Sequence, residues 1–252
     1  MSGTHTKTYR NVLVIGGTGG LGRAVAAEFA PCATTVHLTY HGRRTAAEET
    51  AATVAERGGT AEIHQLTLPD PDPRGPTIRA LLARVTPCDV VVNCAVSGDP
   101  AVATVSNALA FRSVIDANVF GAYQVNAISA QAMAGTGGGS VVNVSSVITR
   151  RYIVGAVGYA AGKAAVEAMT RGFAREWGAV GVRFNTVSPG PIQDTQLLSM
   201  VPAQVMDGMT TPGSADPAVP AQKVASVIRL VTGAGFEAVN GEVVVVDGGF
   251  SL

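Results

Sequence analysis

Residues 12–22 read VLVIGGTGGLG, and this stretch decides the fold of the chain. Four apolar residues of strand character lead into a glycine-rich turn, and helix-forming residues follow from Gly20 to Ala30. Glycine lets a pyrophosphate approach the backbone, and the N-terminus of the next helix offers N–H groups to it. We therefore predict a dinucleotide-binding turn rather than an ordinary tight turn. Its expected contacts are Gly16, Thr18, Gly19, Gly20, Leu21 and Gly22.

The glycine spacing is compatible with two families of nucleotide-binding proteins. Gly16, Gly20 and Gly22 fit Gly-x-x-x-Gly-x-Gly, whereas Gly16, Gly19 and Gly22 fit Gly-x-x-Gly-x-x-Gly. The turn alone does not decide between them.

The end of the second expected strand indicates which dinucleotide binds. An acidic residue there would bind the adenosine ribose diol of NAD, whereas arginine accepts the 2′-phosphate of NADP. This chain has His41, Arg43 and Arg44 and no acid at the strand end. The pattern favours NADP(H), unless the two arginines are only solvated loop residues.

Strand-like and helix-like segments alternate along the chain, which predicts an α/β Rossmann fold: a doubly wound parallel sheet with helices on both faces. Val90-Val91-Val92 and Val243 to Val246 lack polar alternation, as central strands do. The expected strands are 11–15, 34–39, 61–66, 89–92, 140–144, 182–187 and 243–246. The expected helices are 20–30, 45–57, 77–85, 106–133, 158–178 and 221–231.

The domain organisation follows from the absence of a long linker or repeat, which predicts a single domain over 1–252. Residues 1–9 are expected to form a flexible tail. Residues 190–220 are irregular and are expected to form a substrate lid. Apolar lid residues indicate an adaptable pocket, and they are Leu197, Leu198, Met200, Met206 and Met209.

Composition excludes several classes of protein. Hydrophobic residues make up 47% of the 252 residues, which is enough for a large core. The formal net charge is zero, so neither nucleic acid nor an anionic membrane is an expected partner. No apolar run approaches the ~20 residues of a membrane span. The three cysteines form no Cys-x-x-Cys pair, which favours reduced thiols in the cytoplasm. The histidines His5, His37, His41 and His64 show no ligand-like clustering, so no metal site is expected.

Tyr159 and Lys163 are candidates for acid–base chemistry. Residues four apart share one face of a helix, and a nearby cation lowers the pKa of a phenol from about 10. Ser146 ends an expected strand at the carboxyl edge of the sheet, where ligands bind in open α/β folds. Its neighbour Ser145 has the same hydroxyl group, so on chemical grounds alone it is an alternative candidate to bind a substrate carbonyl.

Taken in order, these motifs resemble the short-chain dehydrogenase/reductase family and its ketoacyl-reductase-like branch. The resemblance runs from about Arg10 to the C-terminus. The motifs beyond the glycine turn are Asn93-Cys94-Ala95, Asp116-Ala117-Asn118-Val119, Asn143-Val144-Ser145-Ser146, Tyr159-Ala160-Ala161-Gly162-Lys163, Asn185-Thr186-Val187-Ser188-Pro189-Gly190 and Val246-Asp247-Gly248-Gly249.

The resemblance implies a catalytic tetrad of Asn118, Ser146, Tyr159 and Lys163. The family's serine lies thirteen positions before its tyrosine, which selects Ser146. Tyr159 would protonate the carbonyl oxygen, Ser146 orient it, Lys163 bind the nicotinamide ribose and lower the Tyr159 pKa, and Asn118 hold a water. Tyr159 would also contact the cofactor, and further contacts would be Asn93, Ala95, Pro189, Gly190 and Ile192. NADPH would reduce a β-ketoacyl or polyketide-type ketone, as in fatty acid or polyketide biosynthesis. This substrate would be either free or bound to a carrier protein.

Departures from the family pattern keep two alternatives open. Val96 replaces a glycine beside the cofactor, and Asp194 stands where threonine is usual; a non-catalytic cofactor-binding scaffold would tolerate both. The second glycine spacing suggests an epimerase or dehydratase of the extended branch, which the short chain and the Val246-Asp247-Gly248-Gly249 terminus argue against. Basic residues that would grip an acyl carrier protein are missing at Gly137 and Val180, with Arg150 and Arg151 as possible substitutes. By resemblance, the chain associates as a homotetramer or homodimer through the helices that hold Asn118 and follow Tyr159.

Overall fold

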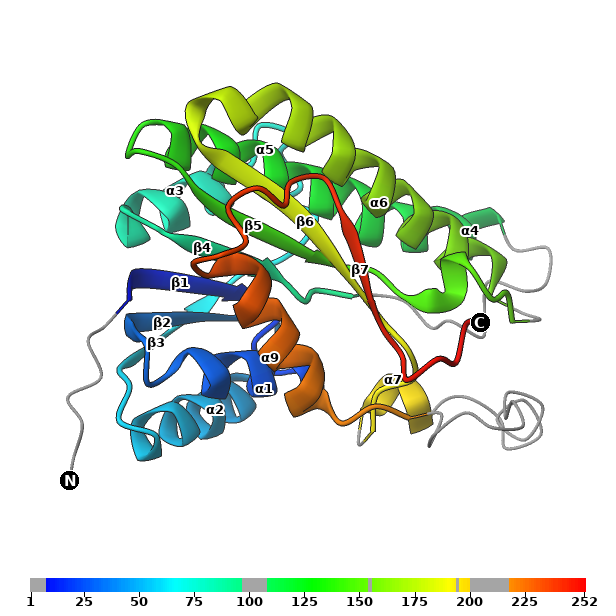
Figure 1. Ribbon diagram of the computed structural model, residues 1–252, viewed down its shortest axis with the longest axis horizontal. Coiled ribbons are helices and arrows are strands. Elements are labelled where there is room, and N and C mark those ends of the chain that lie inside the picture. Colours follow the sequence, from blue (N-terminus) through cyan, green and yellow to red (C-terminus); the bar gives the residue numbers. More distant parts are fainter. Residues whose placement is uncertain (1–7, 97–107, 154–155, 194, 200–217) are drawn as a thin grey trace.

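The computed structural model describes residues 8–96, 108–153, 156–193, 195–199 and 218–252. Its centre is a sheet of seven parallel strands in the order β3-β2-β1-β4-β5-β6-β7 (Figure 1). The strand order reverses between β1 and β4, and open α/β sheets bind ligands at the carboxyl ends of strands at such a reversal. The strands are β1 (Tyr9–Ile15), β2 (Ala33–Tyr40), β3 (Ala61–Gln65), β4 (Val90–Asn93), β5 (Gly139–Val144), β6 (Val182–Pro189) and β7 (Val243–Val246).

Helices cover both faces of the sheet (Figure 1). One face carries α1 (Gly20–Phe29), α2 (Arg44–Glu56) and α9 (Ala221–Thr232). The other carries α3 (Pro76–Val85), α5 (Gly121–Ala134) and α6 (Val157–Trp177). The remaining elements are α4 (Ala108–Ile115), α7 (Gln196–Ser199), a π-helix η2 (Asp116–Phe120) and the 3₁₀ turns η3 (Val147–Thr149) and η4 (Gly178–Val180).

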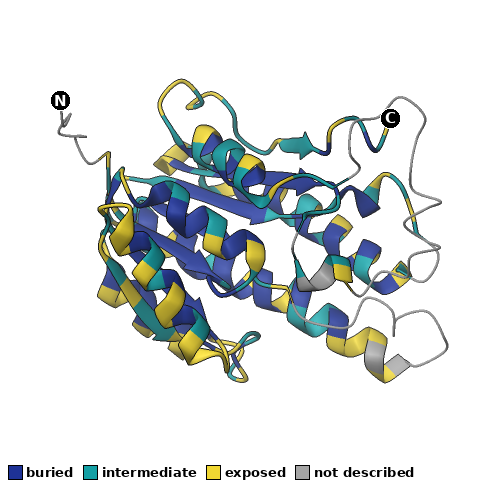
Figure 2. Ribbon diagram, turned by 90° about the horizontal axis from the view of Figure 1, so that it is seen from below, coloured by how far each residue is buried: buried dark blue, intermediate teal, exposed yellow. Residues whose placement is uncertain are grey.

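Successive side chains of β1 enter two separate cores. Val12 and Val14 pack with α1 and α9 on one face, and Leu13 and Ile15 pack with α3 and α5 on the other. All four are at most 1% exposed, and the dark blue strands between the helices of Figure 2 show this burial. A strand buried on both sides needs an apolar residue at every position. The seven-stranded parallel sheet with a core on each face confirms the predicted α/β Rossmann fold.

The predicted helix over 106–133 is interrupted in the structure. Its described part consists of α4, then the π-helix η2, then α5. A π-turn holds one extra residue per turn and is found mostly at functional sites. Asn118 lies in the middle of η2, so the interruption sets the orientation of a predicted site residue.

The predicted N-terminal tail needs correction, and the predicted lid is only partly within the described residues. Tyr9 begins β1, and the backbone N–H of Thr8 donates to the Cys32 carbonyl, so the predicted tail of 1–9 is too long. Residues 1–7 are outside the described ranges. In the predicted lid, Ile192 pairs with Val219 and α7 forms a short helix. Asp194 and residues 200–217, with Met200, Met206 and Met209, lie outside the described residues.

Candidate active site

The glycine turn between β1 and α1 leaves no room for side chains at two positions. Gly16 has a φ of +78°, and a Cβ there would lie 3.0 Å from the Ala95 nitrogen. A Cβ at Gly22 would overlap the Gly16 carbonyl oxygen. At Gly19 a Cβ would make only an ordinary contact of 3.6 Å. The Gly-x-x-Gly-x-x-Gly spacing includes Gly19, but a side chain at that position would meet no close contact that requires glycine.

The turn is fixed to the neighbouring strand and presents the start of α1. Thr39 accepts the Gly16 N–H through its hydroxyl oxygen at 2.9 Å and the Gly17 N–H through its carbonyl at 3.0 Å. Thr18 and Leu21 are buried. The first turn of α1, which begins at Gly20, has no side-chain cap at Gly19 and no acidic residue. Uncapped N–H groups and the helix dipole favour an anion, so the turn fits a pyrophosphate.

The residues predicted to contact the adenosine end lie together after β2. His41, Arg43 and Arg44 are all exposed. Arg44 donates to Glu48 at 2.9 Å, so part of its charge is compensated within α2. His41 Nδ1 lies 3.1 Å from the Thr67 hydroxyl. The corner therefore carries guanidinium groups and no carboxylate on the strand end itself.

The turn after β4 packs directly against the glycine turn. Asn93 is 6% exposed, and its side-chain oxygen accepts the Ala95 N–H at 3.2 Å. Ala95 is the residue that a Cβ on Gly16 would strike. Val96, the departure from the family pattern, is 46% exposed, so it is not buried between the two turns.

Tyr159 and Lys163 lie one turn apart near the start of α6 and face the end of β5. Lys163 is 4% exposed, and its Nζ donates to the Val144 carbonyl at 2.8 Å. The same Nζ lies 5.6 Å from the centroid of the Tyr159 ring. Tyr159 is half-buried. The helical spacing thus brings phenol and ammonium together, as predicted.

Burial shifts the pKa of both groups. Desolvation raises the pKa of Tyr159 to about 12, and its hydrogen bond with Ser146 opposes the shift. Desolvation lowers the pKa of Lys163 to about 8. The net lowering of the Tyr159 pKa that we expected is not seen, because desolvation of the phenol outweighs the groups that lower its pKa. Near neutral pH the phenol keeps its proton, which is the form that can protonate a carbonyl oxygen.

The two rival serines face different partners. Ser146 bonds with Tyr159 and accepts the Ile148 N–H at 3.3 Å, which starts η3. The Ser145 hydroxyl donates to Glu167 of α6 at 2.7 Å. Of the two, only Ser146 is therefore placed to share a substrate oxygen with Tyr159.

Asn118 is 4% exposed and lies against α6. Its side-chain N–H donates to the Val114 carbonyl at 3.0 Å, one turn back in α4. A Cβ on Gly162, between Tyr159 and Lys163 on α6, would lie 3.6 Å from the Asn118 Cβ. The π-helix thus packs its asparagine against the turn of α6 that holds the tyrosine and lysine.

Pro189, Gly190 and Ile192 continue the carboxyl edge of the sheet. Pro189 ends β6, and the Gly190 N–H donates to the Val246 carbonyl at 3.0 Å. A Cβ on Gly190 would lie 3.0 Å from the Asp247 Cβ, so a larger residue would press this segment away from Asp247. The bridge from Ile192 to Val219 extends the same edge.

Several contacts around the site were not predicted. Glu167 accepts bonds from Ser145 and, at 3.0 Å, from Thr149, and it fastens the segment around Ser146 to α6. Arg151, a possible carrier-protein contact, instead donates to the Phe250 carbonyl at 2.7 Å and stacks on its ring. Two histidines also cluster, contrary to expectation, because His37 Nδ1 lies 3.1 Å from His64 Nε2.

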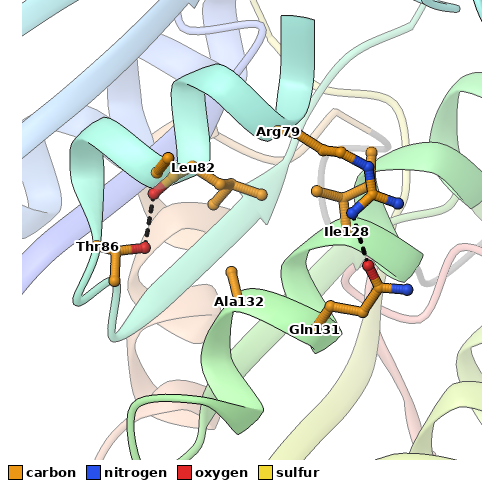
Figure 3. A pocket seen from close by; sticks show the side chains of 7 residues that line it. Arg79, Leu82, Thr86, Ile128, Gln131 and Ala132 are labelled. Carbon is orange, nitrogen blue, oxygen red and sulfur yellow. Dashed lines mark hydrogen bonds between the residues drawn. The ribbon is translucent and has the colours of Figure 1, made fainter. Parts of the chain in front are cut away.

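Two further features lie apart from these residues. A pocket of about 350 Å³ opens between α3 and α5, lined among others by Arg79, Leu82 and Gln131 (Figure 3). None of the predicted site residues lines it, so it does not belong to the candidate site. Within the described ranges, the helices are too short or too polar to cross a membrane.

Known proteins resemble the chain over almost its whole length. A sequence model described as short chain dehydrogenase matches residues 10–205. Acetoacetyl-CoA reductase of Allochromatium vinosum is 28% identical, covering 96% of this chain and 99% of that protein. A chloroplastic NADPH-dependent aldehyde reductase-like protein of Arabidopsis thaliana is 26% identical, covering 96% and 94%. The structure of levodione reductase matches with a TM-score of 0.86 at 27% identity, covering 96% and 97%.

Proposed function

The chain belongs to the short-chain dehydrogenase family, and we propose that it is an NADPH-dependent reductase of a β-ketoacyl or polyketide-type ketone. One observation carries the proposal. Tyr159 is hydrogen-bonded to Ser146 and lies one helical turn from the buried Lys163, at the carboxyl edge of the sheet next to a turn fitted to a pyrophosphate.

The residues of the site divide the chemistry between them. Bound NADPH supplies a hydride. Tyr159 donates its proton to the carbonyl oxygen of the substrate, and the Ser146 hydroxyl donates a hydrogen bond that orients this oxygen. The Lys163 ammonium, held by Val144, is placed to bind a ribose hydroxyl and to stabilise the phenolate that forms.

Two observations support NADPH over NADH. Arg43 and Arg44 stand after β2, where a carboxylate would bind the ribose diol of NAD. Guanidinium groups bind phosphate by charge-assisted hydrogen bonds. One relative is described as NADPH-dependent.

The substrate class rests on the relatives and on the fit of the site. Acetoacetyl-CoA, the substrate of one relative, is a β-ketoacyl thioester. Gly137 and Val180 carry no charge where a carrier protein would be bound, and Arg151 is engaged with Phe250, which leaves Arg150 as the exposed arginine of the pair. Because one exposed arginine is a small basic surface for a carrier protein, we propose a free or CoA-bound ketone as the substrate.

The experiment is a panel of acetoacetyl-CoA, a short β-keto ester and a cyclic diketone, assayed by loss of reduced nicotinamide absorbance with each cofactor. We expect kcat/KM to be higher with NADPH than with NADH. In Arg43→Ala the NADPH value should fall about 10- to 100-fold, as the loss of a charged hydrogen bond implies, while the NADH value changes little. Arg57→Ala, an exposed arginine at the end of α2, is the control. No turnover with any carbonyl would favour the scaffold alternative.

We also propose that the chain associates through α5 and α6. Ala161, Ala164 and Ala168 are exposed along one face of α6, and Tyr123 of α5 is 49% exposed. Small residues spaced three and four apart allow a second helix to approach closely. Light scattering should give twice or four times the mass of the chain, and the mass of a single chain would contradict the proposal.

A further inference from the structure

Three potential metal ligands gather on β2 and β3, away from the catalytic residues. His37 Nδ1 lies 3.1 Å from His64 Nε2. The Glu62 carboxylate oxygen Oε2 lies 3.7 Å from the first of these nitrogens and 3.9 Å from the second. Each residue thus offers one ligand atom, and the three atoms lie within 4.8 Å of one another.

Strand register explains why the three side chains meet. His37 of β2 pairs with Glu62 of β3, and Thr39 pairs with His64. Paired residues of neighbouring parallel strands point to the same face, and residues two apart in a strand do so as well. His37 also pairs with Leu13 of β1, which enters the core under α3 and α5, so the cluster lies on that face.

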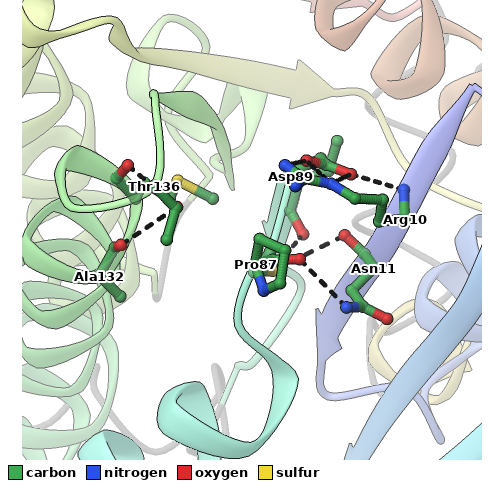
Figure 4. A network of polar contacts seen from close by, with 9 residues as sticks. Arg10, Asn11, Pro87, Asp89, Ala132 and Thr136 are labelled. Atoms are coloured by element: carbon green, nitrogen blue, oxygen red, sulfur yellow. Dashed lines mark hydrogen bonds and ion pairs between the residues drawn. The ribbon is translucent and has the colours of Figure 1, made fainter.

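Asn11 fixes the proton on His37. The Asn11 amide N–H donates to the Pro87 carbonyl at 3.0 Å (Figure 4), so its oxygen Oδ1 is turned to His37 Nε2 at 3.1 Å. An amide oxygen only accepts hydrogen bonds. His37 Nε2 must therefore carry the hydrogen, and in the neutral ring the Nδ1 lone pair faces His64 and Glu62.

This arrangement matches a protein metal site, both in its ligand atoms and in the hydrogen bond that orients a ligand. Metal-binding histidines typically donate their other N–H to an oxygen that fixes the ring, as His37 does to Asn11. Tetrahedral zinc with bonds of 2.0–2.1 Å to nitrogen needs ligand atoms about 3.4 Å apart. The three distances of 3.1, 3.7 and 3.9 Å scatter around this value.

We propose that His37, His64 and Glu62 bind a divalent transition-metal ion of the zinc type, with water as the fourth ligand. The ion would tie the edge strand β3 to β2. Two imidazoles and one carboxylate, with one position left for solvent, form a donor set that zinc accepts. The Glu62 side chain is 57% exposed, which gives the ion a path from solvent.

The facing nitrogens of the two rings can both serve as ligands. Because Asn11 fixes the hydrogen of His37 on Nε2, the His64 Nε2–H donates to His37 Nδ1 when no ion is present. When an ion binds, this hydrogen moves to His64 Nδ1 and both facing nitrogens become ligands, so binding needs no net loss of a proton.

The charges around the cluster make Glu62 and Arg84 decisive. Glu62 attracts a cation, whereas Arg84 of α3 lies close enough to disfavour positive charge on both histidines. Removing Arg84 should strengthen metal binding, and removing the Glu62 charge should weaken it.

The test is a titration of the chelator-stripped full chain with Zn²⁺ against a chromophoric chelator, and with Co²⁺ by its visible absorption. We expect one metal ion per chain and the intense bands of tetrahedral Co²⁺. Glu62→Gln should weaken Zn²⁺ binding at least about 10-fold. His64→Gln removes a direct ligand and should exceed the 10- to 100-fold loss usual for outer-shell changes. Arg84→Gln should tighten it, and saturating Zn²⁺ should raise Tm in the unchanged chain but not in His64→Gln.

The control is His41→Gln, which removes the other described histidine and should leave the affinity for Zn²⁺ unchanged. Circular dichroism checks that each variant is folded. Failure of the folded chain to bind Zn²⁺, or equal binding by the unchanged chain, Glu62→Gln and His64→Gln, would overturn the proposal. This readout does not depend on catalysis, so it stands or falls separately from the proposed reductase activity.

Discussion

Tyr159→Phe should lower kcat for ketone reduction by about 10²- to 10⁴-fold, the range usual for loss of a general acid. Phenylalanine keeps the ring that packs beside Lys163 but has no proton to donate. The ring is half-buried, and the change removes only one hydroxyl, so the fold should be retained. Because the glycine turn and the β4 turn are untouched, NADPH should bind with nearly unchanged affinity, measured by fluorescence titration.

The control for this change is Tyr152→Phe. Tyr152 is 74% exposed, and the same hydroxyl removal there should leave kcat and KM unaltered. Substantial turnover by Tyr159→Phe would show that another group protonates the carbonyl oxygen of the substrate. If NADPH binding were lost together with activity, the phenol would instead serve mainly to hold the cofactor.

The sequence predicted those parts of the site that depend on local pattern. Every residue of β1 from Val12 to Ile15 is apolar, so a strand buried on both faces was predictable, as was the turn that follows it. Tyr159 and Lys163 share a helix face because of their spacing alone. The choice of Ser146 over Ser145 came from resemblance, and its physical basis is visible only in the structure, where Ser145 faces Glu167.

Features that depend on contacts between distant segments could not be predicted. His37 and His64 are 27 residues apart, and only the register of β2 and β3 brings them together. The bond of Arg151 to Phe250 spans 99 positions. The π-helix at Asn118 interrupts residues with an ordinary helical pattern, and it occurs where this segment packs on α6. The lowered histidine pKa values follow from burial, which no local pattern revealed.

Gly22→Ala should destabilise the protein and abolish measurable binding of NADPH. The new Cβ would overlap the Gly16 carbonyl oxygen and lie 2.9 Å from the Gly17 Cα, and both are backbone atoms that cannot rotate away. Overpacking of this kind costs about 1–3 kcal/mol. For a domain of this size that corresponds to a fall in Tm of about 2–12 °C, measured by thermal denaturation. Either the turn or α1 must shift, and the N–H groups that face the pyrophosphate shift with it.

A matched substitution separates this steric effect from the general effect of alanine in a helix. Gly172 lies inside α6, and a Cβ there would meet nothing within 4 Å. Alanine is favoured over glycine in a helix by about 0.5–1 kcal/mol, so Gly172→Ala should raise Tm slightly and leave NADPH binding intact. The same chemical change should therefore have opposite signs at two helical positions. If Gly22→Ala were as stable as Gly172→Ala and still bound NADPH, the close approach of α1 to the Gly16 carbonyl could not be what shapes the dinucleotide site.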